Sequence, residues 1–501
     1  MNKGKQVKTP FFDALVTYNN DDIVPFDVPG HKRGRLVNEF TKEVGLKTME
    51  LDVNLPRGLD NLNNPVGVIK EAEELLADAY SADYGFFLVD GSTVGILTMI
   101  LAVVGTNDVI IMPRNVHKSA ISGLILAGAK PVFVCPEIDQ ELGIANAVSF
   151  EAYAKAIDEH PEAKAVFIIH PTYFGVVGDA CKIVAYAHEH NMVVIADEAH
   201  GAHFAFSRLM PKHAIACGAD LVTSSLHKTG GSLTQSSILL MNENKYVSVQ
   251  ELKYILSMLQ TTSPNALLLA SLDVARKVLA MEGPVLLRNA VELSDYACKE
   301  LNKLKGIVTY NSEYFKTKSV GVYKHDPTKL IIKVTGLGLT GFDVYKMMKD
   351  EYHIQLELAE SYVVLAIISI GTTKADIEKL IKAFTSLWER YFGTINRRHT
   401  YQYHDLAPVA KMRPRDAYNS PKKFVRFKDC VGCIAAEAVM AYPPGIPIVI
   451  PGEEISKEML KAMYNYRKEG TTLITQFGNG FIEVVDCEQL KEMNEHETQK
   501  G

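Results

Sequence analysis

The sequence predicts an α/β protein built on a mainly parallel β-sheet that helices cover. Between residues 76 and 275, short apolar runs alternate with amphipathic, helix-like segments. The runs are rich in Val and Ile and apolar at both odd and even positions, which is typical of strands buried on both faces. Their alternation with helical segments favours parallel strands joined by crossover helices. The predicted strands are 109–113, 131–136, 165–172, 193–198, 221–227 and 237–241, with helices at 148–160 and 178–190.

The composition is that of an ordinary globular protein. Hydrophobic residues make up 47% and charged residues 22% of the 501-residue chain, which excludes a disordered or fibrous protein. A chain of this length buries on the order of three quarters of its unfolded surface, so its core needs no metal or disulfide. The 53 basic and 59 acidic residues leave a formal net charge of −6. The net charge therefore gives no reason to expect binding to nucleic acid or anionic membranes.

The seven cysteines are too sparse and irregular to predict a disulfide framework. Cys430 and Cys433 form a C-x-x-C pair, but no second pair completes a zinc site, so we expect a structural pair, with a redox pair as the alternative. The N-terminus lacks the apolar region of a secretory signal. The longest apolar stretch, 95–105, is too short to span a bilayer. We therefore expect a reduced, soluble, cytoplasmic protein that binds no metal.

Changes in composition divide the chain into five units. The first is rich in Asn, Asp, Pro and Gly and shows little periodicity, and the fourth is polar, basic and proline-containing. We find no internal repeat and no low-complexity tract. The predicted units are an N-terminal arm with loops (1–75), a large domain (76–275), a small α+β domain (276–395), a linker (396–425) and a small terminal module (426–501).

Lys228 is the most informative residue of the large domain. It follows a buried strand directly, at the sheet edge where open α/β folds bind ligands. A lysine there is poorly solvated, and desolvation lowers its pKa and frees an amine that can form an imine with an aldehyde cofactor. Ser225 and His227, close by in the same segment, could donate to a phosphate. The alternative is a surface lysine at a strand–loop junction.

Asp197 closes the strand VVIAD, so its carboxylate is expected at the same edge of the sheet. A buried aspartate requires a cationic partner. A protonated pyridine nitrogen would serve, because the ion pair keeps the ring protonated and able to accept electrons. The alternative is an N-cap for the following turn.

Two further segments carry polar residues that could contribute to such a site. DGSTVGILTMI (90–100) places Ser92 and Thr93 before a long apolar helix, where hydroxyls and free N–H groups can bind a phosphate. In PRNVHKSA (113–120), His117 could stack on an aromatic ring. The alternatives are ordinary helix caps and a core histidine.

Together these features describe a phosphate site, an acid for a ring nitrogen, a stacking ring and an imine-forming lysine, which is the set that pyridoxal phosphate needs. The chain resembles the bacterial ornithine/lysine/arginine decarboxylase family, which has the aspartate-aminotransferase fold. The motifs follow the family's order over nearly the whole length: PGHK (29–32), RNVHKS (114–119), HPTYFG (170–175), DEAHG (197–201), SLHKTGGSLTQSS (225–237), TTSP (261–264), YPPGIP (442–447) and PGE (451–453).

The resemblance implies pyridoxal 5'-phosphate bound as an imine to Lys228, with Asp197 at the ring nitrogen and His200 near the substrate. The other implied cofactor contacts are His117 and Ala199 on the two ring faces, and Ser92, Thr93, Ser225 and His227 at the phosphate. In relatives, a threonine of the TTSP segment reaches the phosphate of the neighbouring subunit, which here means Thr261 or Thr262. The active site is then complete only in a homodimer.

The resemblance also implies decarboxylation of a basic amino acid in polyamine biosynthesis. Arginine, giving agmatine, is favoured because the chain most resembles short arginine decarboxylases without the N-terminal wing domain that larger members use to build rings. Lysine, giving cadaverine, and ornithine, giving putrescine, stay open, as does assembly beyond a dimer. Lys228, His227 and His200 are the alternative Cα proton donors. Candidates for the substrate's cationic group are Glu357, Glu453 and Asp60, each of which could equally be structural.

Three rival interpretations are considered. GLGLTG (336–341) has the dinucleotide-binding spacing, with Glu357 about 20 residues on. Too few strands follow for such a fold, and a turn capped by Thr340 explains the same residues. A second rival is an aminotransferase or lyase of the same fold, but no arginine fork for a substrate carboxylate is found by motif. The third is a non-catalytic relict that acts as a binding partner.

Overall fold

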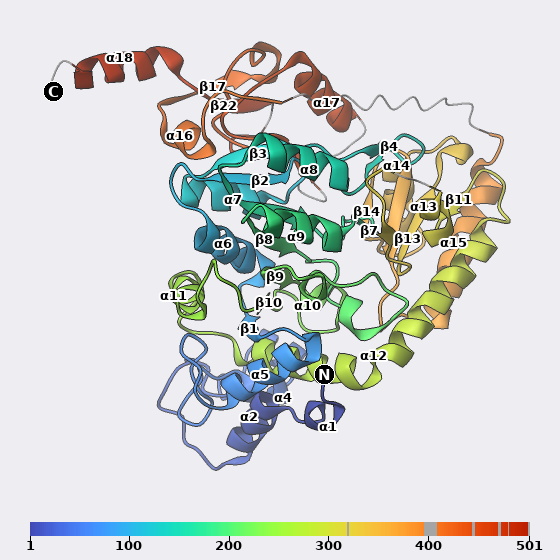
Figure 1. Cartoon of the computed structure of the whole chain (residues 1–501). Helices are drawn as coiled ribbons and strands as arrows, with labels where there is room; N and C mark the ends of the chain where they lie inside the picture. Colours follow the sequence, from blue (N-terminus) through green and yellow to red (C-terminus); the bar gives the residue numbers. More distant parts are fainter. Residues whose placement is uncertain (318–319, 395–407, 443–445, 469–471, 479, 499–501) are drawn as a thin grey trace.

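A seven-stranded sheet forms the centre of the molecule (Figure 1). The structure, a computed structural model, describes residues 1–317, 320–394, 408–442, 446–468, 472–478 and 480–498. Strands pair in parallel from β9 to β3, while β10 and β1 add an antiparallel edge. The predicted α/β class with a mainly parallel sheet is confirmed. In spatial order the strands are β1 (Tyr84–Leu88), β10 (Ser237–Met241), β9 (Leu221–Ser224), β8 (Val193–Asp197), β6 (Ala163–Ile169), β2 (Val109–Pro113) and β3 (Lys130–Val134).

All six predicted apolar runs become strands of this sheet, and β1 is the one member that the sequence did not predict. Both faces are buried, which explains the continuous apolar runs. Along β8, Val194 and Ala196 join one core cluster while Val193 and Ile195 join the other. The helices that cover the two faces are α2 (Pro10–Asn20), α5 (Val68–Tyr80), α8 (Phe150–Glu159), α9 (Ala180–Glu189) and α12 (Ala266–Leu301) on one side, and α6 (Gly91–Val103), α7 (Lys118–Ala127) and α11 (Val249–Leu259) on the other.

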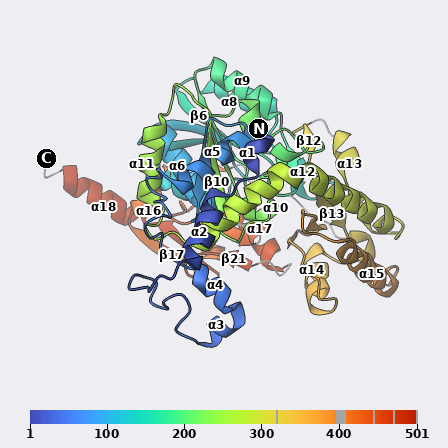
Figure 2. The same cartoon turned by 90° about the horizontal axis from the view of Figure 1, so that it is seen from below.

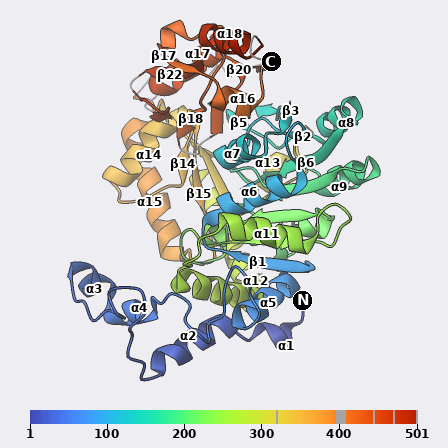
Figure 3. The same cartoon turned by 90° about the vertical axis from the view of Figure 1, so that its left-hand side faces the viewer.

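The N-terminal region is more ordered than the predicted arm and loops. Helix α2 packs against α5 and α12, and its Phe11 and Leu15 are fully buried in the main core. The backbone N–H of Phe11 also donates to Asp273 of α12, at 3.0 Å. The prediction of loops is therefore wrong for α2. Pro10 in its first turn is a residue typical of helix starts and could have indicated the helix. The other helices here are α1 (Lys3–Gln6), α3 (Glu39–Val44) and α4 (Leu46–Leu51), the last two extending away from the sheet (Figures 2 and 3).

The small domain is an antiparallel four-stranded sheet beside the large one, reached through α12 (Figure 1). The segment GLGLTG follows β13, whose neighbours β11 and β15 both run antiparallel to it. Thr340 and Asp343 form a capping box at the start of α14. The dinucleotide-site alternative is therefore wrong, because such a site needs a parallel βαβ unit. The elements are β11 (Val308–Tyr310), α13 (Ser312–Lys316), β13 (Lys329–Lys333), α14 (Gly341–Asp350), β14 (Leu358–Ala359), β15 (Val363–Ile367) and α15 (Lys374–Tyr391).

The terminal module lies at the β3 end of the large sheet (Figures 1 and 3). Of the predicted linker, 396–407 lie outside the described residues, and the remainder contains short elements. Arg415 of α16 donates to the backbone carbonyl of Ile125 on α7, at 2.7 Å, so this part of the chain is fixed to the large domain. The module's elements are β16 (Val409–Ala410), α16 (Pro414–Asn419), β17 (Lys422–Arg426), β18 (Val439–Tyr442), β19 (Ile446–Val449), β20 (Glu453–Glu454), α17 (Lys457–Lys468), β21 (Thr472–Ile474), β22 (Phe481–Val485) and α18 (Cys487–Thr498).

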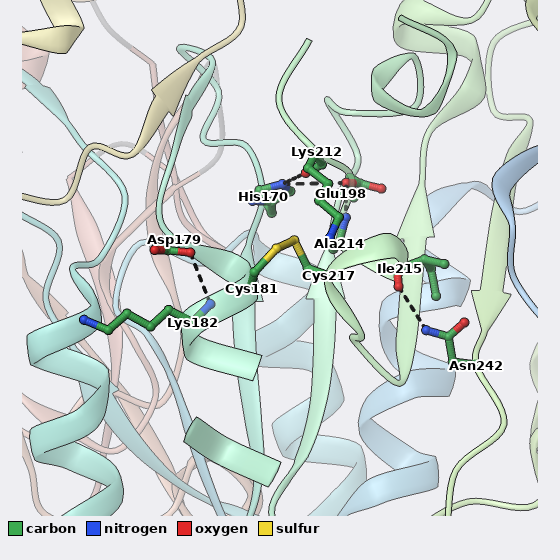
Figure 4. The surroundings of a disulfide bond; sticks show 10 residues. All are labelled: His170, Asp179, Cys181, Lys182, Glu198, Lys212, Ala214, Ile215, Cys217 and Asn242. Carbon is green, nitrogen blue, oxygen red and sulfur yellow. Dashed lines mark hydrogen bonds and ion pairs between the residues drawn. A yellow bond between two sulfur atoms is a disulfide. The ribbon is translucent and has the colours of Figure 1, made fainter. Parts of the chain in front are cut away.

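A disulfide joins Cys181 of α9 to Cys217, in the short helix that precedes β9 (Figure 4). The expectation of a fully reduced chain is therefore wrong for this pair. Cys298, Cys430, Cys433 and Cys487 are free thiols. The two bonded cysteines are 36 residues apart, and only the packing of α9 beside the segment before β9 brings them together, so spacing along the chain carried no signal.

We expect loss of this disulfide to lower stability. Closing a loop of this length restricts the unfolded chain by roughly 3–4 kcal/mol, so Cys217→Ser should lower the apparent melting temperature by several degrees and make it insensitive to reductant. Differential scanning calorimetry with and without reductant measures this. Cys487→Ser, which removes an exposed free thiol, is the matched control. Alkylation of all seven cysteines in the denatured, unreduced wild type would contradict the bond.

In the described residues, no helix is both long and apolar enough to cross a membrane. The His, Cys, Asp and Glu side chains of the same residues form no group of three or more that could hold a metal ion.

Candidate active site

The carboxyl edge of the large sheet gathers the polar residues that the sequence singled out. Because β1 and β9 both run antiparallel to β10, they end at the same edge as the other parallel strands. Ser92, after β1, and Ser225, after β9, are 133 residues apart, yet the Ser225 hydroxyl donates to that of Ser92 at 2.8 Å. Asp197 ends β8 at the same edge.

Lys228 lies on α10 (Leu226–Thr229), a single helical turn that begins directly after β9. Its Nζ is 2.9 Å from His200 Nε2 and 5.5 Å from the centre of the Tyr173 ring. Burial lowers the pKa of Lys228, and the charges of Asp197 and Glu357 oppose this shift only in part. A larger fraction of the amine is therefore unprotonated and nucleophilic than for an exposed lysine.

Asp197 is a buried carboxylate, with 8% of its surface exposed. Its Oδ1 accepts the backbone N–H of Ala199 at 3.1 Å, and the described residues form no ion pair with it. Burying such a charge without a cation is costly. The carboxylate therefore fits a cationic group of a ligand, and the same hydrogen bond also makes it a local cap.

The neighbouring Glu198 holds the turn after β8 in place. It is fully buried, and its Oε1 accepts the backbone N–H of Ala214 at 2.9 Å (Figure 4). His170 Nε2 lies 4.0 Å from the same carboxylate and 2.8 Å from the Lys212 carbonyl. Burial raises the pKa of Glu198 well above its usual range, so the carboxyl is favoured in its neutral form. Its contacts hold the segment that follows Asp197 in the sequence.

The start of α6 presents the groups that the sequence predicts for binding an anion. Ser92 and Thr93 occupy its first turn, where unpaired backbone N–H groups attract negative charge. A side chain at Gly95 would lie 2.2 Å from Thr223 Oγ1, so only glycine lets α6 pack this closely on β9. That close packing sets the position of the helix start beside Ser225.

Thr261 lies next to this helix start in its own chain. Its backbone N–H donates to Asp90 Oδ2 at 3.0 Å, and its hydroxyl is 3.3 Å from that of Ser263. The contact of Thr261 or Thr262 with the phosphate of a neighbouring subunit stays a prediction.

His117 and His227 are both favoured as neutral rings. His117 caps α7, and its Nδ1 lies 2.9 Å from the Ser119 hydroxyl. His227 Nδ1 lies 2.9 Å from the Ser236 carbonyl, so this nitrogen carries the ring proton. Burial is the main cause that lowers the pKa of both histidines. A neutral ring at His117 is suited to stacking on a pyridine ring.

The three candidate carboxylates have different surroundings. Glu453 is 1% exposed and forms a bidentate ion pair with Arg114, at 2.9 and 2.8 Å. The same arginine donates to the carbonyls of Pro447 and Ile448. This ion pair connects the terminal module to the large domain, and it leaves Glu453 without a free edge for a substrate.

Asp60 holds the loop before α5. Its carboxylate accepts backbone N–H groups from Val66, Gly67 and Ile69 at 2.7 to 3.1 Å. Burial would raise its pKa, but these backbone hydrogen bonds lower it. The side chain is therefore used as a structural acceptor.

Glu357 is the one of the three that faces the lysines. It lies just before β14, and its Oε1 accepts the Tyr173 hydroxyl at 2.5 Å. Its charge raises the pKa of both Lys228 and Lys329 and acts in the same direction on His227.

Sequence reasoning missed two residues of this cluster. Tyr173, in the HPTYFG motif, packs its ring on His200 with centroids 4.1 Å apart. Lys329 lies 3.2 Å from His200 Nδ1. The HPTYFG motif indicated the segment that contains Tyr173. Lys329 begins an apolar run, and nothing in that pattern predicts that its side chain is buried.

Comparison with known families matches residues 9–376 to the Orn/Lys/Arg decarboxylase major domain and residues 396–492 to the C-terminal domain of the same family. An arginine decarboxylase of Halalkalibacterium halodurans is 42% identical over 468 residues, or 93% of this chain and 95% of that protein. The arginine decarboxylase of Bacillus subtilis is also 42% identical, over 92% of this chain and 94% of its own length.

Solved structures show the same fold. The lysine decarboxylase LdcF of Francisella novicida superposes with a TM-score of 0.82 at 19% identity, covering 96% of this chain and 82% of that one. Lysine decarboxylase A of Pseudomonas aeruginosa gives the same TM-score at 21% identity, covering 96% and 81%. A serine palmitoyltransferase of Sphingomonas wittichii matches less closely, with a TM-score of 0.53 at 16% identity, covering 73% of this chain and 86% of that one.

Proposed function

The chain belongs to the Orn/Lys/Arg decarboxylase family and is a basic-amino-acid decarboxylase; from this premise we propose that its substrate is arginine, its product agmatine, and its cofactor pyridoxal phosphate held at Lys228. One observation carries the choice of arginine. Four arginine decarboxylases are 40–42% identical to it over 89–93% of the chain. The lysine decarboxylase LdcA of Pseudomonas aeruginosa is only 24% identical. Agmatine would then enter polyamine biosynthesis.

The residues at the sheet edge fit the cofactor group by group. The first turn of α6 with Ser92, Thr93 and Ser225 offers donors to a phosphate. Asp197 is buried and forms no ion pair in the described part of the chain. This is expected of a carboxylate whose cationic partner is the protonated ring nitrogen of a ligand. Lys228 supplies a desolvated amine for the aldehyde. We assign His117 and Ala199 to the ring faces, and His227 to the phosphate.

Pyridoxal phosphate supplies an electron-accepting ring, into which the electron pair left by a departing carboxylate can spread. Asp197 keeps a proton on the ring nitrogen by holding a negative charge beside it. Asp197 and His200 are both buried, and low exposure to water strengthens an ion pair at this position. Replacement of CO2 by hydrogen consumes one proton. We assign its delivery to Lys228 with His200 behind it, because His200 Nε2 contacts Nζ directly.

We assign the cationic end of the substrate to Glu357, since Glu453 and Asp60 already serve as structural acceptors. We expect Glu357→Gln to raise KM for arginine about 10- to 100-fold with a smaller change in kcat, because a charge-assisted contact is lost. Steady-state kinetics measure both constants. Glu351→Gln, at an exposed carboxylate of the same domain, is the matched control. An unchanged KM in Glu357→Gln would remove Glu357 from the substrate site.

We also propose a homodimer that shares its active sites through Thr261 or Thr262. Exposed apolar side chains gather in the N-terminal region, among them Phe26, which is 93% exposed. Such surface is typical of an interface that a second copy covers. The expected result of analytical ultracentrifugation is a species of twice the chain mass, and a monomer that turns over arginine would contradict the shared site.

Incubation of cofactor-supplied protein with arginine, lysine or ornithine, separately, tests the reaction and the substrate together. We expect equal amounts of CO2 and agmatine, with arginine preferred. Faster release of cadaverine or putrescine would reassign the substrate. Turnover only with an added keto acid would indicate an aminotransferase, and no product from any substrate would indicate a non-catalytic protein.

A further inference from the structure

Lys329, His200 and Lys228 form a continuous hydrogen-bonded chain. Lys329 Nζ lies 3.2 Å from His200 Nδ1, and Lys228 Nζ lies 2.9 Å from His200 Nε2. Lys329 and His200 are 1% and 5% exposed. Lys329 begins β13 of the small domain, whereas the other two residues belong to the large domain. The chain therefore connects the two domains through the imidazole.

Glycine at position 175 lets Lys329 reach the ring. Gly175 has φ +85°, and a Cβ there would lie 2.6 Å from Lys329 Cγ. The charged groups around Lys329 Nζ are Asp326, Glu357 and Lys228, of which the two carboxylates favour the ammonium. Asp326 also accepts both the N–H and the hydroxyl of Thr328, and His203 Nε2 lies 3.2 Å from it.

The imidazole limits the number of protons in this chain. A neutral histidine carries one N–H, and its other nitrogen accepts. With both hydrogen bonds formed, the lysine that accepts the ring N–H must therefore be a free amine, while the other lysine donates and can stay an ammonium. Burial and the two flanking lysines hold the pKa of His200 well below its usual range, which keeps the ring neutral. Burial also lowers the pKa of Lys329, to about 8.

Lys329 is the better place for the ammonium. The carboxylate that most favours an ammonium at Lys228 is Asp197, and in the proposed function Asp197 is paired with the cofactor's ring nitrogen. Asp326, the corresponding carboxylate of Lys329, contacts His203 of the protein itself and not the cofactor, so its charge stays beside Lys329 when the cofactor binds. Cofactor binding therefore increases the difference between the two lysines.

We propose that Lys329 is a positioning residue of the reaction: its ammonium donates to His200 Nδ1, which leaves the ring proton on Nε2 facing Lys228 and keeps Lys228 a free amine. This inference rests on the proposed function. The free amine would attack the aldehyde carbon of the cofactor, with C=N replacing C=O, and the aldehyde oxygen would leave as water with the two hydrogens of the amine. A Lys228 ammonium has no lone pair with which to attack.

The pH dependence of cofactor attachment tests this role. Cofactor-free protein is incubated with pyridoxal phosphate over pH values spanning neutrality and reduced with borohydride, and the label at Lys228 is quantified by peptide mapping. We expect Lys329→Met to move the midpoint of attachment up by about one pH unit, because losing the positive charge of Lys329 favours an ammonium at Lys228. Lys329→Arg, a permanent cation, should leave the midpoint at or below that of the wild type.

Lys333→Met makes the same substitution on the same strand, at a lysine that pairs with Glu141 instead, and should not move the midpoint. If Lys329 were merely structural, Lys329→Met and Lys329→Arg would lose cofactor attachment alike, and that result overturns the inference. A midpoint of attachment in Lys329→Met equal to that of the wild type also overturns it. If Lys329→Met does not fold, an upward shift in Lys329→Arg is sufficient to overturn it. Wild-type protein without label at Lys228 would instead refute the proposed function, and this inference with it.

Discussion

Lys228→Ala should reduce decarboxylation by more than about 10⁴-fold, the largest effect expected for any single substitution in this chain. Among the described residues near Asp197, Lys228 has the amine that is both partly desolvated and placed at the end of a sheet strand. Lys329 has an amine as well, but it lies behind His200, and we expect it not to replace Lys228. CO2 release from arginine, with borohydride labelling in parallel, measures both losses.

The control for this experiment is Lys155→Ala, at a lysine of α8 whose side chain is 74% exposed. It should retain both turnover and label. Full activity in Lys228→Ala would refute the assignment of the cofactor lysine. Label on Lys329 in the wild type would instead transfer that role to the small domain.

Asp197→Asn should retain the cofactor weakly and lose turnover by about 10²- to 10³-fold, which corresponds to loss of one partner of a buried charge pair. An asparagine can still accept the Ala199 N–H, so the turn after β8 should be preserved while the ring nitrogen loses its counter-charge. Single-turnover kinetics and a titration of cofactor affinity separate the two effects.

The same substitution at a true helix cap distinguishes the alternatives for Asp197. Asp179 caps α9 by accepting the Lys182 N–H at 3.1 Å, and asparagine caps helices about as well as aspartate. Asp179→Asn should therefore behave like the wild type. If Asp197→Asn is equally harmless, its carboxylate is only a cap and the proposed ring contact is wrong.

Local pattern was enough to predict most of the large domain. Six apolar runs predicted six of the seven strands, because a strand in a sheet covered on both faces must be apolar along its whole length, whatever its connections to other elements. Lys228 and Asp197 could be singled out because each ends such a run with a charge that is costly to bury. The family assignment, carried by motifs from residue 29 to residue 453, is confirmed by the family match.

Proximity between distant segments could not be predicted in the same way. The Cys181–Cys217 bond depends on how α9 packs beside the chain before β9. The three carboxylate candidates looked alike in sequence, and only their partners separate them: Arg114 for Glu453, backbone N–H groups for Asp60, and the Tyr173 hydroxyl for Glu357.

The sequence by itself determined the fold class, the family and the sheet edge at which the chemistry is expected, because these depend on periodicity and on polar residues at strand ends. The tertiary structure alone decided that Lys329 of the small domain reaches His200 of the large one. The reason is physical. Hydrophobic patterning records whether a position is buried, but whether a buried charge meets an imidazole, a carboxylate or a backbone amide depends on where another part of the chain comes to lie.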